Sequence, residues 1–188
     1  MARRIARVVI LAEDQRSESF VYRYLKLAVR VNHRDVRRYR SPGGSAEQFV
    51  RTRYPAEVRE HRSRIHKASR NAVLIVHIDA DTEPVNRRLE SLAQALQESG
   101  QSPRSDEEQI VILVPKRHTE TWLHGLCGVS VTEEQDCKRE LRDHDQRINE
   151  AAASLFELTR PNAGEPPPHL PALRLAVREL RRLKTEND

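Results

Sequence analysis

Apolar and polar positions along the chain predict strands that alternate with helices. Short apolar runs at residues 6–12, 72–78 and 109–114 are typical of buried strands. The segments between and after them predict helices over residues 15–30, 45–68, 85–99 and 119–126. This order predicts an α/β fold with a mostly parallel sheet and helices on both faces.

Two other regions depart from that pattern. Residues 34–40 are too polar for a central strand and are expected to form an edge strand at best. Residues 132–145 are nearly all polar, as in a loop or an exposed helix, and a proline-rich connection at 161–171 separates helices expected at 147–158 and 172–184. We therefore divide the chain into an α/β core (1–128) and a helical extension (129–188) that packs on or beside it.

Acidic residues follow two of the predicted strands directly. Glu13 comes after the first apolar run, and Asp79 and Asp81 end the run at 72–78. Parallel strands end at the same edge of a sheet, where ligands of open α/β sheets bind, so these three carboxylates are expected to meet. Carboxylates that face one way are costly to keep charged unless a cation joins them, and hard oxygen ligands suit Mg²⁺ or Mn²⁺. The alternative is an ordinary turn after a strand, where Asp is common, with Asp14 capping the next helix.

A strand that ends in Glu and a later strand that ends in Asp-x-Asp together resemble the Toprim domain. This domain occurs in topoisomerases, primases, OLD-family nucleases and small stand-alone nucleases of bacterial antiviral defence. The resemblance covers about residues 5–125. It implies a Toprim-like, Rossmann-like core in which Glu13 ligates metal or moves a proton and Asp79 and Asp81 ligate metal.

Other positions match the family more loosely. The family usually has Gly where this chain has Asp14. The resemblance implies that Glu18, a second acid near Glu13, and Glu120 are further metal ligands, and that Lys116 neutralises developing charge.

Charge is distributed unevenly along the 188 residues. Residues 1–70 hold 18 lysines and arginines against 7 acids, whereas the rest of the chain holds 15 against 21. Basic density beside a candidate metal site suits a polyanion, DNA or RNA, and the cluster expected to contact it is Arg34, Arg37, Arg38 and Arg40. The alternative is a solvated helix face with local pairing to Glu57 and Glu60.

Several function classes lack their sequence signals. There is no Walker A motif, no glycine-rich dinucleotide turn and no nucleophile elbow, and eight aromatic residues are too few for a base-stacking platform. Glu83 stands where haloacid dehalogenase phosphatases want Thr or Val. The spacing of His118, His124, Cys127 and Cys137 matches no strong zinc pattern. No apolar run reaches the length of a signal peptide or a membrane span, so we expect a cytoplasmic protein.

These observations lead to two hypotheses. The first is a Mg²⁺- or Mn²⁺-dependent nuclease that hydrolyses phosphodiesters and, by the resemblance, works beside an ATPase partner. The second is a non-catalytic Toprim-like subunit that binds nucleic acid or a protein partner.

Overall fold

A four-stranded parallel sheet forms the centre of the molecule. The structure is a computed structural model that describes residues 5, 7–29, 31–68, 71–138 and 144–183. In these ranges the strands are β1 (Arg7–Ala12), β2 (Val36–Arg40), β3 (Ala72–His77) and β4 (Ile110–Leu113), arranged in the order β2-β1-β3-β4. All neighbouring pairs are parallel, which confirms the predicted α/β class.

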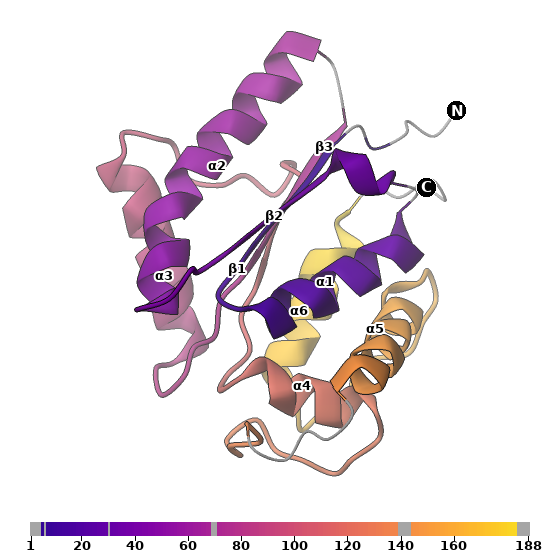
Figure 1. Cartoon of the computed structure of the whole chain (residues 1–188). Coiled ribbons are helices and arrows are strands. Elements are labelled where there is room, and N and C mark those ends of the chain that lie inside the picture. Colours follow the sequence, from indigo (N-terminus) through magenta and orange to yellow (C-terminus); the bar gives the residue numbers. More distant parts are fainter. Residues whose placement is uncertain (1–4, 6, 30, 69–70, 139–143, 184–188) are drawn as a thin grey trace.

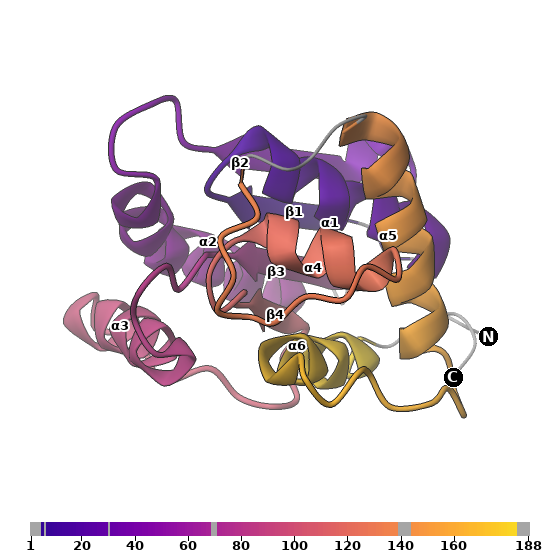
Figure 2. The ribbon, with the colours of Figure 1, turned by 90° about the horizontal axis from the view of Figure 1, so that it is seen from below.

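Helices cover both faces of this sheet (Figure 1). Helices α2 (Ala46–Ala68) and α3 (Val85–Glu98) lie on one side, and α1 (Gln15–Ala28), α4 (Thr119–Leu126), α5 (His144–Thr159) and α6 (Pro171–Arg181) lie on the other. A short 3₁₀ turn, η1 (His33–Asp35), precedes β2. Figure 2 shows the same separation from a second direction. Each side has its own hydrophobic cluster, so the sheet is buried by two apolar layers.

The burial of each strand follows its composition. All six residues of β3 are buried, because this strand lies between two others and under helices on both faces. In β2 the arginines are exposed and the strand stands at the edge of the sheet, as its polarity predicted. Residues 6, 30 and 184, which the sequence placed at the ends of elements, and 139–143 of the polar segment lie outside the described residues.

The two C-terminal helices pack against the α/β core. Ala151 and Leu155 of α5 and Leu173 and Val177 of α6 belong to the same buried cluster as residues of β1, α1 and α4. Glu133 ties α6 to this cluster, because its carboxylate accepts hydrogen bonds from the first backbone N–H groups of the helix.

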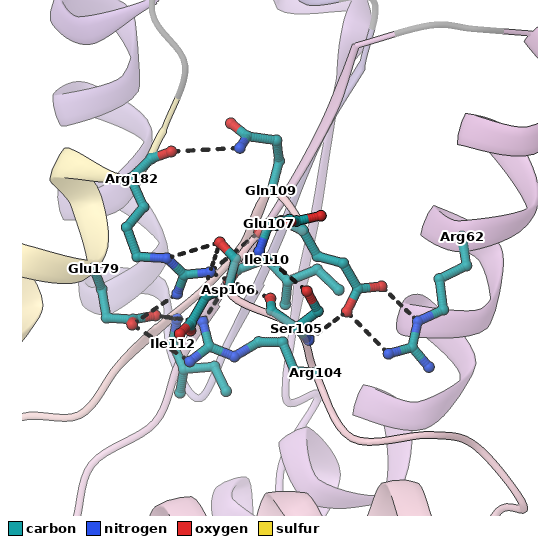
Figure 3. Close-up of polar contacts among 11 residues, drawn as sticks. Arg62, Arg104, Ser105, Asp106, Glu107, Gln109, Ile110, Ile112, Glu179 and Arg182 are labelled. Carbon is teal, nitrogen blue, oxygen red and sulfur yellow. Dashed lines mark hydrogen bonds and ion pairs between the residues drawn. The ribbon is translucent and has the colours of Figure 1, made fainter.

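A polar network holds α6 along the free edge of β4 (Figure 3). The carboxylate of Glu179 accepts hydrogen bonds from Arg104 (2.6 Å) and from the backbone N–H of Ile112 in β4 (3.4 Å). Arg182, directly after α6, donates to the same carboxylate (2.8 Å) and to the carbonyl oxygen of Asp106 (2.6 Å). The helix therefore satisfies part of an otherwise open strand edge.

Among the described residues, no helix combines the length and the apolar composition that crossing a bilayer requires.

Candidate functional site

The ends of β1 and β3 bring Glu13 and Asp79 together. Ala12 pairs with His77 in the parallel register, so the residues that follow them leave the sheet side by side. The backbone N–H of Asp79 donates a hydrogen bond to Oε1 of Glu13 at 3.2 Å. The prediction that these strand ends are neighbours is confirmed.

The segment after β3 is held in place by the segment after β4. The backbone N–H of Ala80 donates to the carbonyl oxygen of Pro115 (2.8 Å), and that of Asp81 donates to Arg117 (3.3 Å). Asp81 adopts a left-handed conformation (φ 56°), which Asp tolerates better than most residues. The resulting turn buries the carboxylate of Asp79 and leaves that of Asp81 45% exposed.

Glu13, Asp79 and Asp81, called here the carboxylate cluster, interact strongly. Burial, followed by the negative charges of Asp79 and Asp81, raises the pKa of Glu13 to about 8. The Asp79 backbone N–H and the Arg88 guanidinium oppose this shift only in part. At neutral pH Glu13 therefore holds a proton unless a cation replaces it.

Two hydroxyl groups support Asp79 from neighbouring helices. Oγ1 of Thr119, the first residue of α4, donates to Oδ1 of Asp79 at 3.3 Å. The hydroxyl of Ser17 in α1 lies 2.7 Å from that of Thr119, and both side chains are buried. This chain of contacts fixes the orientation of the Asp79 carboxylate.

An imidazole faces the two aspartates. His118 Nδ1 lies 3.7 Å from Oδ2 of Asp79 and 3.5 Å from Oδ1 of Asp81. On the other side of the ring, Nε2 lies 3.8 Å from Oδ1 of Asp136. The side chain is only 8% exposed, so it closes one side of the carboxylate cluster.

Arg88 of α3 lies on another side of the carboxylate cluster. Its Nη2 lies 4.0 Å from Oδ2 of Asp81, and its Nη1 lies 2.9 Å from Oε1 of Glu47. The sequence pattern pointed neither to Arg88 nor to His118 and Thr119 as parts of this site. The sequence did hold one signal for His118 and Thr119. They stand at the start of the helix that follows β4, and β4 lies beside β3 in the sheet.

Two of the acids implied by the family resemblance are held by arginines. The buried carboxylate of Glu18 contacts Arg40 at 2.8 Å and Arg38 at 3.1 Å. Glu120, also buried, forms an ion pair with Arg16. The structure thus gives these two carboxylates cationic partners, and their assignment as metal ligands stays a prediction.

Lys116 follows β4 but its ammonium group is directed to the loop after β3. Nζ donates to the carbonyl oxygen of Glu83 at 3.3 Å and lies 3.8 Å from the carboxylate of Glu134. A catalytic role for Lys116 stays a prediction.

The donor types around the carboxylate cluster suit a divalent cation, because carboxylates and an imidazole converge there. As the side chains stand in the described part of the chain, however, no group of three or more His, Cys, Asp or Glu residues is arranged to hold a metal ion. A cation would therefore have to draw the donors closer and displace the proton of Glu13.

The basic residues fall into two groups, one in residues 34–40 and one along α2. Arg34 and Arg37 are exposed on η1 and β2, whereas Arg38 and Arg40 remain 47% and 48% exposed while they contact Glu18. Along α2, local ion pairs join arginines to neighbouring acids, including Glu57 and Glu60, as the alternative of a solvated helix face expected. The candidates for phosphate contact are therefore concentrated in residues 34–40.

Comparisons with protein-family models, with curated proteins and with solved structures found no match to this chain.

Proposed function

We propose that this protein is a divalent-cation-dependent nuclease whose Toprim-like core cleaves phosphodiester bonds at the carboxylate cluster. The observation that carries the proposal is the meeting of Glu13, Asp79 and Asp81 at the carboxyl ends of two adjacent parallel strands. Open α/β sheets bind their ligands at this edge, and carboxylates crowded in a partly buried site need a cation or a proton between them.

The residues of the site have distinct tasks in this proposal. Asp79, oriented by Thr119, and Asp81 supply charged oxygen ligands for Mg²⁺ or Mn²⁺. Glu13, in its deprotonated form, would accept a proton from an attacking water. A bound cation supplies Lewis-acid stabilisation of the phosphate and a more acidic water.

The basic strand β2 lies beside this site. Arg40 pairs with Ala12 in the register, and the backbone N–H of Ser41 donates to the carbonyl oxygen of Glu13 at 3.2 Å. Arg40 is thus next to the carboxylate cluster, whereas Arg37, which pairs with Val9, and Arg34 lie further back along the strand. They would hold the phosphate backbone of DNA or RNA without reading its sequence.

The test is a cleavage assay on single- and double-stranded DNA and RNA with Mg²⁺ or Mn²⁺. Wild type should cleave at least one substrate, Asp79→Asn and Asp81→Asn should lose that activity, and Asp106→Asn should keep it. Asp106 is a suitable control because its side chain is 93% exposed and its ion-pair partner is Arg182, on the far edge of the sheet. Equal cleavage by wild type and Asp79→Asn would overturn the proposal.

The second candidate is a non-catalytic subunit that contacts nucleic acid or a partner such as an ATPase. The ion pairs of Glu18 and Glu120 favour it, because two acids of the implied set are already neutralised by arginines. Asp14 favours it too, since its carboxylate caps α1 by accepting from the Ser17 N–H at 2.8 Å. Binding of nucleic acid that is equal with EDTA and with Mn²⁺, without cleavage, would support this candidate.

A further inference from the structure

His118 is a buried histidine that borders the carboxylate cluster. The residue precedes α4 and is 6% exposed, yet its Nδ1 is buried without a hydrogen-bond partner among the described residues. Buried polar atoms are nearly always satisfied in folded proteins, so such an atom calls for a missing partner. Nδ1 faces Asp79 and Asp81, so a ligand that satisfies this nitrogen would also contact the carboxylate cluster.

The distances around Nδ1 limit what that partner is. Ligands at about 2.1 Å from one cation stand about 3.0 Å apart in an octahedral site and about 3.4 Å apart in a tetrahedral site. Nδ1 lies 3.5 Å from Asp81 Oδ1 and 3.7 Å from Asp79 Oδ2. These separations exceed the octahedral spacing by about 0.5–0.7 Å and the tetrahedral spacing by less. The half-exposed Asp81 side chain can close its part of the gap, and a small rotation of the His118 ring would close the part toward the buried Asp79.

The other ring nitrogen supports the same conclusion. Histidines that bind metal through one nitrogen almost always have a carboxylate or carbonyl group behind the other, which fixes the ring and raises its basicity. Here Nε2 is directed to Asp136, whose Oδ1 is 3.8 Å away. A carboxylate thus stands on each side of the imidazole.

We propose that His118 is a ligand of the cation held by Asp79 and Asp81, and that it makes the site select first-row transition ions over Mg²⁺. This inference rests on the proposed function in one respect only, namely that a cation binds at the carboxylate cluster. The selectivity follows from ligand chemistry, because Mg²⁺ takes oxygen ligands almost exclusively, whereas divalent transition ions accept imidazole nitrogen.

Pulsed electron paramagnetic resonance of bound Mn²⁺ tests this without any measurement of activity. Wild type loaded with one equivalent of Mn²⁺ should show ¹⁴N modulation from a coordinated imidazole. His118→Gln should lose that modulation and bind Mn²⁺ at least about tenfold more weakly, with little change for Mg²⁺. His33→Gln is the matched control, because His33 is exposed in η1.

The outcomes separate this inference from the proposed function. Bound Mn²⁺ without ¹⁴N modulation in wild type would overturn the inference, whether or not the protein cleaves nucleic acid. This result comes from wild type alone, so it does not depend on the folding of a variant. Failure to bind Mn²⁺ would overturn it as well. Clear ¹⁴N modulation in a protein that cleaves no substrate would support the metal site and reject the nuclease.

Discussion

The charge state of Glu13 gives a prediction with a definite sign. Its pKa rises from 4.5 in the unfolded chain to about 8 in the folded chain, chiefly by burial. A group with a raised folded pKa contributes stability that is present below about pH 4.5 and is lost as pH rises through about 8. The cation-free wild type should therefore lose stability across this window.

The size of the loss follows from the shift. A difference of about 3.5 pKa units at about 1.4 kcal/mol per unit sets an upper bound of about 5 kcal/mol. Glu13 is partly accessible to solvent, and screening reduces this value, so we expect about 2 kcal/mol or more. Glu13→Gln keeps the shape of the side chain but cannot ionise, and it should remove that part of the pH dependence.

Urea unfolding in EDTA from pH 4.5 to pH 9 measures the effect. The free energy of unfolding of wild type minus that of Glu13→Gln should fall as pH rises and should level off above about pH 8. Other titrating groups cancel in this difference because both proteins contain them. Parallel curves for the two proteins would refute the reasoning that burial and the two aspartates hold a proton on Glu13.

Three further predictions concern other parts of the molecule. Glu133→Gln should lower the free energy of unfolding by about 1–3 kcal/mol, because Glu133 anchors the start of α6, while Glu134→Gln, 71% exposed at its carboxylate, should have little effect in the same urea titration. Arg37→Glu should weaken nucleic-acid binding and reduce its log–log salt slope by about one unit, whereas Arg87→Glu on α3, 73% exposed, should not, as fluorescence anisotropy at several salt concentrations will show. Burial lowers the pKa of His61 to about 4, so stability should fall as pH drops from about 6.5 to about 4, and His61→Gln should flatten that part of the acid unfolding curve.

The architecture was accessible from the sequence because local patterns determine it. The apolar run of β3 requires burial on both faces, and the arginines of β2 restrict that strand to an edge. Helix α4 has the predicted bounds, and the parallel pairing of β1 with β3 placed Glu13 beside Asp79. Helix α5 begins at His144, three residues before the predicted start, because its first turn is polar and carries no apolar periodicity.

The surroundings of the carboxylate cluster could not be read in the same way. Thr119 meets Asp79 across 40 residues of sequence and Ser17 across 102, so no local spacing reports these contacts. The same holds for Glu18, whose partners Arg38 and Arg40 come from another element. Which acids stay unpaired depends on the packing of distant elements, and the sequence shows only that acids are present.

Isothermal titration of the cation-free protein with Mn²⁺, beside Asp79→Asn and the Asp106→Asn control, tests the central claim most directly. We predict saturable binding to wild type and to Asp106→Asn, and its loss in an Asp79→Asn protein that still unfolds cooperatively, because the Asp79 carboxylate is buried at the centre of the cluster. Identical binding by all three proteins, or none in wild type, would contradict a cation site at the carboxylate cluster.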